Sequence, residues 1–178
     1  GIVQDALLAV CNMTKRGIFL EREQVMHVMV WMPSWNGVLP APAILKPKQL
    51  WSGKQIFSLV LPPINYRGTS MCGPPPNTAD DLNLYDSETL ITNGELIQGT
   101  IDKNIVGAKA GSIVHLTWMD LGWEETRRFM NEIQMVVNAW MCNRSYTVGV
   151  ADTVADETTM KAIHAALTEA KENVRNTM

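Results

Sequence analysis

Residues 124–141 read EETRRFMNEIQMVVNAWM, the clearest helical pattern in the chain. The apolar side chains recur at intervals of three and four residues, which places them on one face of an α-helix. They are Phe129, Ile133, Val136, Val137, Trp140 and Met141. Because this apolar face is broad, we predict that the helix buries one side in a core formed by the rest of the chain.

The last part of the chain shows a narrower pattern. A helix is predicted from Asp156, as its N-cap, to Arg175. Its apolar residues alternate at intervals of three and four, the spacing of a helix that packs on one other helix. They are Met160, Ile163, Leu167, Ala170 and Val174, which we call the apolar seam. No glycine closes this helix, so we expect a partner helix beyond Met178 and a chain that is a piece of a longer protein.

The remaining patterns predict an α+β fold with N-terminal helices and a small, mostly antiparallel sheet. Ser52 and Gln55 have the spacing of a capping box that starts a helical turn. Asn93 and Gly94 tolerate the positive φ angles of a tight hairpin turn. Helices are expected over 2–13 and 22–32, and extended segments over 18–20, 57–61, 89–92, 95–101, 112–119 and 146–150.

A proline-rich region separates the first helices from the sheet. All nine prolines lie between Pro33 and Pro76, so residues 33–50 are predicted to form an extended strap and residues 62–86 a long polar loop. No acidic residue occurs between Glu23 and Asp80. The same interval contains four basic residues, Lys46, Lys48, Lys54 and Arg67. These residues form either a cationic patch that steers an anion or separate solvated side chains.

Composition excludes several classes of protein. With 46% hydrophobic residues, 19% charged residues and a net charge of −3, the chain can bury a core and is not a uniformly basic nucleic-acid binder. The three cysteines are scattered, which argues against a disulfide scaffold and a zinc site. The three histidines lack ligand spacing, and no apolar run is long enough to span a membrane. No nucleophile with a general base can be assembled from the spacing.

The strap carries a resemblance to a known family. Residues 35–47, WNGVLPAPAILKP, and residues 50–58, LWSGKQIFS, resemble the largest subunits of eukaryotic RNA polymerase II. Further matches follow in the same order along the chain. They are GIVQD at 1–5, NGELI at 93–97, NEIQ at 131–134 and VGVADTVAD at 148–156. The stretch without a match covers roughly residues 62–88, and single positions that depart from the family pattern are Asn36, Gln49, Asn104 and Ala151.

The resemblance implies a place for this chain within a nucleotidyltransferase. Residues 1–150 would be the pore domain, beside the active site, and residues 151–178 the first helix of the funnel domain. The family's aspartate-rich motif for catalytic Mg²⁺ does not occur here. The resemblance therefore implies no catalytic and no metal-binding residue in this chain, and no activity in isolation. Lys103 and Lys54 are candidates for lining the channel that admits nucleotides.

The resemblance also implies partners and a compartment. The expected partners are the other subunits of RNA polymerase II, the DNA template, the RNA product, nucleoside triphosphates and a transcript-cleavage factor at the funnel. The expected location is the nucleus, without membrane attachment. The alternative is a stand-alone intracellular binding module that grips an anionic partner with the cationic strap. Coding sequence upstream that contains the aspartate motif would distinguish the two.

Overall fold

The computed structural model describes residues 1–72 and 86–177. The chain divides into two compact units, Gly1–Arg144 and Ser145–Met178, which are described separately. Every buried residue of the described chain belongs to the first unit. The core and the surfaces that it positions are therefore features of residues 1–144.

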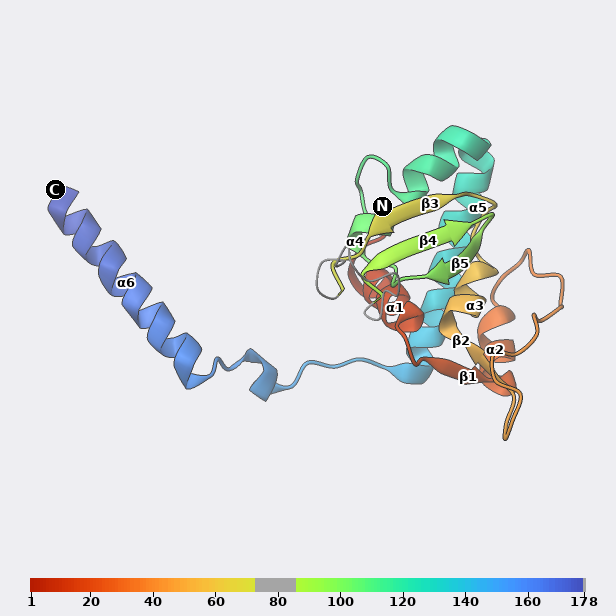
Figure 1. Cartoon of the computed structure of the whole chain (residues 1–178), viewed down its shortest axis with the longest axis horizontal. Coiled ribbons are helices and arrows are strands. Elements are labelled where there is room, and N and C mark those ends of the chain that lie inside the picture. Colours follow the sequence, from red (N-terminus) through yellow and green to blue (C-terminus); the bar gives the residue numbers. More distant parts are fainter. Residues whose placement is uncertain (73–85, 178) are drawn as a thin grey trace, which may run out of the picture. The chain divides into compact units, whose positions relative to one another are not determined.

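The first unit combines helices with two small antiparallel sheets, which confirms the predicted α+β fold (Figure 1). Strands β1 and β2 form one sheet, and β3, β4 and β5 form the other in that order. The elements are α1 (Gln4–Thr14), β1 (Phe19–Glu21), α2 (Arg22–Met29), β2 (Leu50–Ser52), α3 (Gly53–Ser58), β3 (Tyr66–Thr69), β4 (Glu88–Thr92), β5 (Glu95–Gln98), α4 (Lys103–Val106) and α5 (Ile113–Arg144).

Helix α5 is the centre of the unit. Helices α1 and α2 pack against it, while α1 also contacts α3, and α3 contacts β5. The helices thereby connect α5 to the three-stranded sheet (Figure 1). Phe129, Ile133, Val136 and Val137 are all buried, so the predicted core face of residues 124–141 is confirmed.

The first part of α5 corrects one prediction. Residues 112–119 were expected to be a strand, but from Ile113 onward they are helical. Ile113 and Thr117 are the fully buried positions, and the Thr117 hydroxyl donates to the Ile113 carbonyl at 2.8 Å. Burial thus repeats every four residues, although the alternation of apolar side chains also fits a strand. Gly122, at φ 86°, interrupts the helix and separates this part from the predicted core helix.

Two other predicted strands are also wrong. Residues 57–61 were expected to be extended, but α3 runs through Phe57 to Ser58, and the next residues form a turn. The buried side chains of Ile56, Phe57, Val60 and Leu61 follow helical spacing. Residues 146–150 form no strand in the described second unit, where a short 3₁₀ turn covers Val150–Thr153.

The capping box that starts α3 is confirmed. The Ser52 hydroxyl accepts from the Gln55 amide at 3.2 Å, and the Gln55 side chain accepts from the Ser52 amide at 3.0 Å. Both bonds satisfy amides that a helix start leaves without partners. This cap fixes Lys54 as the second residue of α3.

The proline-rich strap is confirmed. Residues 30–49, all described, contain no helix or strand and connect α2 to β2. The Trp51 indole donates to the Pro40 carbonyl at 2.8 Å, and the Gln55 side chain donates to the Ala41 carbonyl at 3.0 Å. The strap is therefore held against the residues that begin α3.

The hairpin turn is confirmed, but the long loop before it is only partly so. Asn93 and Gly94 have φ angles of 48° and 79° between β4 and β5. The loop predicted over residues 62–86 contains strand β3, which pairs with β4. Residues 73–85 of that prediction lie outside the described residues.

The second unit consists of the 3₁₀ turn and helix α6 (Glu157–Thr177). Asp156 caps α6 as predicted, because its carboxylate accepts from the Thr159 amide at 3.2 Å. Bonds from Thr158 and Thr159 lower the pKa of Asp156 below its usual value. No described residue of α6 is buried. Among the described helices, none combines the length and apolar character needed to cross a membrane.

Candidate functional site

Lys54, one of the two predicted channel residues, is held in an ion pair. Its ammonium lies 2.6 Å from the Asp86 carboxylate, and the two side chains are only 17% and 11% exposed. The charge of Lys54 is therefore largely compensated within the fold. This pair connects α3 to the residues just before β4, which makes Lys54 a structural contact of this unit.

Lys103, the other predicted channel residue, is exposed at the first position of α4. The Asp102 carboxylate caps this helix by accepting from the Asn104 amide at 2.9 Å. Gly107 ends the helix by donating its amide to the Lys103 carbonyl at 3.0 Å. Within the described chain, Lys103 belongs to none of the ion pairs. Its charge is thus available to solvent.

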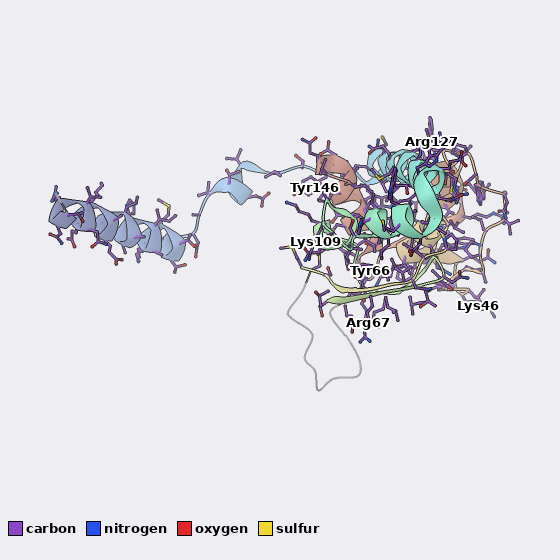
Figure 2. All side chains as sticks on the ribbon, turned by 90° about the horizontal axis from the view of Figure 1, so that it is seen from above. Lys46, Tyr66, Arg67, Lys109, Arg127 and Tyr146 are labelled. Atoms are coloured by element: carbon purple, nitrogen blue, oxygen red, sulfur yellow. The ribbon has the colours of Figure 1, made fainter. Side chains whose placement is uncertain are left out.

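Lys109 is a second exposed cation in this neighbourhood, which sequence reasoning missed. Its amide donates to the Gly107 carbonyl at 2.9 Å, and its carbonyl accepts from the Ser112 amide at 3.1 Å. Figure 2 shows Lys109 at the surface of the first unit. The available signal was a lysine in the connection between Gly107 and Gly111. We call residues 102–109 the α4 corner.

The buried carboxylate of Asp102 holds the α4 corner against the three-stranded sheet. One oxygen accepts from the Ser70 hydroxyl at 3.1 Å and from the Met71 amide. The Ser70 amide in turn donates to the Ser87 carbonyl at 2.7 Å. Asp102, 5% exposed, therefore fastens the corner to the residues that follow β3 and precede β4. No local pattern in the sequence singles out Asp102.

Helix α1 holds the α4 corner from the other side. The hydroxyl of Thr14, which is fully buried, accepts from the Ile101 amide at 3.0 Å and donates to the Val10 carbonyl at 2.8 Å. Near the start of the chain, the Ile2 amide donates to the Val106 carbonyl at 3.1 Å. These bonds fix the backbone at Ile101 and Val106, on either side of Lys103.

A continuous polar path connects the two predicted lysines. Lys54 pairs with Asp86, and the carbonyl of the next residue, Ser87, accepts from the Ser70 amide. The Ser70 hydroxyl donates to the carboxylate of Asp102, which precedes Lys103 in the chain. The structure therefore places both lysines on one connected framework. Their roles differ, because Lys54 is paired within the framework while Lys103 projects from it.

The basic residues of the acid-free interval are largely neutralised in space. Lys48 pairs with Glu21, and Arg67 lies 2.5 Å from the Glu88 carboxylate, which raises the pKa of Arg67. With Lys54 on Asp86, three of the four basic residues have acidic partners from outside the acid-free interval. Lys46, the fourth, and Arg67 lie at separate places on the first unit (Figure 2). Of the two alternatives left open by the sequence, this arrangement favours separate side chains over a concentrated anion site.

A shallow groove of about 400 Å³ lies between the start of the strap and α5. Its wall carries both acidic and basic side chains, and Arg128 pairs with Glu125 at 2.5 Å. Its lining consists of Pro33, Glu124, Glu125, Arg127, Arg128, Asn131, Glu132 and Met135. Mixed charge of this kind favours no single class of charged ligand. Among residues 1–72 and 86–177, no cluster of three His, Cys, Asp or Glu side chains could hold a metal ion.

Comparison with known proteins places this architecture in a family. The chain belongs to the family described as RNA polymerase Rpb1, domain 3, whose model matches residues 1–153. It is similar to the DNA-directed RNA polymerase II subunits RPB1-A and RPB1-B of Trypanosoma brucei brucei, with 41% identity over 174 residues in each case. These matches cover 98% of this chain and 9% of each relative. The family resemblance of the strap is thus confirmed.

Proposed function

We propose that this chain shapes the pore beside the active site of a DNA-directed RNA polymerase II. Residues 1–150 act as the pore domain, and residues 151–178 begin the funnel domain. The observation that carries the proposal is the family match over residues 1–153. The division of the chain at Arg144 and Ser145, close to the proposed boundary, supports two domains.

The activity belongs to the longer protein in this proposal. The relatives are named as subunits of DNA-directed RNA polymerase II, a nucleotidyltransferase that makes RNA from nucleoside triphosphates on a DNA template. Its Mg²⁺ would be held by carboxylates outside this chain, because the family's aspartate-rich motif does not occur in this sequence. The partners would be the other polymerase subunits and, at the funnel, a transcript-cleavage factor. The location would be the nucleus.

Within the pore, we assign nucleotide contact to the α4 corner. Lys103 and Lys109 are exposed, and lysine binds phosphate as a compact charge. A pair of such charges on one wall of a channel attracts the polyanionic nucleotide before it reaches the active centre. Lys54 acts as a positioning residue, because its ion pair with Asp86 supports the framework that holds Asp102.

The polymerase that contains this chain tests the assignment. We expect Lys103→Ala and Lys109→Ala each to raise the KM for nucleoside triphosphates about two- to tenfold, with little change in kcat, because each removes steering and not chemistry. The matched control is Lys46→Ala, an exposed lysine on the strap. The assignment is wrong if the α4-corner variants behave like the control in elongation assays at low ionic strength.

A second experiment addresses the chain alone. The purified 178-residue chain is expected to show no Mg²⁺-dependent RNA synthesis, since phosphoryl transfer of this kind depends on metal held by clustered carboxylates. Template-dependent incorporation of labelled nucleotide by the chain would contradict the proposal. The alternative, a stand-alone binding module with a cationic strap, is disfavoured by the pairing of Lys48, Lys54 and Arg67 with acids.

A further inference from the structure

Two cysteines that lie far apart in the sequence meet in the first unit. The sulfur atoms of Cys11, on α1, and Cys72, after β3, are 3.6 Å apart and in hydrogen-bond contact. Both residues are half-buried, and both are free thiols. The third cysteine, Cys142, is exposed near the end of α5. In the sequence the three cysteines are scattered, and 61 residues separate this pair.

Hydrogen bonds on both sides of the pair hold Cys11 and Cys72 close together. The Cys72 amide donates to the Ser70 hydroxyl at 3.0 Å, and that hydroxyl donates to Asp102. Ile101, the neighbour of Asp102, donates its amide to Thr14, which lies three residues after Cys11 on α1. A closed circuit of bonds therefore runs from one cysteine to the other. The short sulfur–sulfur distance is a consequence of this framework.

We propose that Cys11 and Cys72 are a modification site, a thiol pair that a hydroperoxide converts into a reversible disulfide. A disulfide has its sulfur atoms about 2.05 Å apart, so the two atoms need to approach by roughly 1.5 Å. In this proposal the two side chains rotate to close that gap while the hydrogen bonds around them are kept. The bond would fasten α1 directly to the segment that Asp102 already anchors.

The reaction balances with one equivalent of hydrogen peroxide. The thiolate of one cysteine attacks a peroxide oxygen, the O–O bond breaks, and the products are a sulfenic acid and, after protonation, water. The sulfur of the other cysteine then attacks the sulfenic sulfur, the S–O bond breaks, and the departing hydroxide takes up the thiol proton as a second water. The two sulfurs are oxidised by two electrons in total, and the peroxide is reduced.

The environment of Cys11 sets the conditions for this reaction. Burial, followed by the hydrogen bond and charge of Cys72, raises the pKa of Cys11 to about 11, while Lys15 opposes the shift and Asp102 adds to it. Cys11 is therefore mostly protonated at neutral pH, and its small thiolate fraction limits the rate at which it attacks a peroxide. Closure is expected to become faster as the pH rises from 7 to 9.

Tryptic mapping tests the proposal, because each cysteine falls on its own peptide: 1–15, 68–103 and 129–144. The reduced 178-residue chain is treated with one equivalent of hydrogen peroxide, alkylated and digested. We expect peptides 1–15 and 68–103 to be joined with the loss of two hydrogens, peptide 129–144 to be alkylated, and dithiothreitol to reverse the joining. Alkylation of all three peptides, or joining that involves 129–144, would overturn the proposal.

Variants sharpen the result. Cys142→Ser is the matched control and should still close the bond. Cys11→Ser and Cys72→Ser should each lose it, and the remaining thiol should be trapped as a sulfenic acid by dimedone. Because the wild-type map needs no variant, the test stands even if one variant folds poorly. The oxidised chain should also show a higher Tm than the reduced chain, since the bond closes a long loop.

Discussion

Helices α5 and α6 are both amphipathic, yet only α5 is built into a core. Ile133 of α5 is 1% exposed, whereas Leu167, in the apolar seam of α6, is 52% exposed. The apolar face of α5 is broad and is covered by α1 and α2. The seam of α6 is narrow, and no described residue of α6 is buried. A periodic apolar pattern therefore indicates a helix, but the partners decide whether its face is buried.

Hydrogen exchange should give the largest difference between the two helices. Amides of residues 133–137 are expected to exchange only when the first unit unfolds, and those of residues 167–174 by local fraying. For a unit of ordinary stability, the ratio of protection factors should be about 10³ or more. Exchange measured by mass spectrometry on the intact chain checks this. Equal protection would mean that the apolar seam is buried in solution.

Truncating one side chain on each helix should give the next largest effect. Ile133→Ala is expected to lower the free energy of unfolding by about 3 kcal/mol, because it leaves a cavity among buried neighbours. Leu167→Ala, the matched control on α6, should change it by less than about 0.5 kcal/mol, since both residues favour helix and the site is exposed. Urea titration of the two variants measures the difference. Similar losses would contradict the contrast.

Two threonines with the same local bond allow a finer comparison. Thr14 and Thr168 each donate a hydroxyl at 2.8 Å to the carbonyl four residues earlier, but only Thr14 also accepts, from the buried Ile101 amide. Thr14→Val leaves that amide without a partner and should cost about 1–2 kcal/mol. Thr168→Val should be nearly neutral. If both variants have the same urea midpoint of unfolding as the wild-type chain, Thr14 does not anchor the α4 corner.

Local signals in the sequence were sufficient for much of the fold. Ser52 and Gln55 predicted the start of α3, Asp156 the start of α6, and Asn93 with Gly94 the hairpin, because each acts through neighbouring backbone groups. The prediction of a strand over 112–119 was wrong because a short apolar run fits both the two-residue repeat of a strand and the 3.6-residue repeat of a helix. Only the burial of Ile113 and Thr117 distinguishes the two.

The sequence predicted less of the candidate site than of the fold. The start of α3 placed Lys54 correctly on a helix, but its partner Asp86 lies 32 residues away and comes close only through the sheet. In the sequence Asp102 is an ordinary candidate for a helix cap. Only the structure shows that its second carboxylate oxygen accepts from the Ser70 hydroxyl and the Met71 amide. Contacts between distant segments depend on tertiary packing, which no local pattern specifies.

The pairing of β1 with β2 has a consequence for how the strap can vary. Phe19 lies opposite Ser52 and Glu21 opposite Leu50, so the intervening chain, which consists of α2 and the strap, has its two ends already fastened together. The entropy of closing such a loop grows only with the logarithm of its length, by about 0.6 kcal/mol for each doubling. A Cβ at Gly37 would meet no atom within 4 Å. We therefore expect the outer part of the strap to accept an inserted epitope while the framework around α3 keeps its shape.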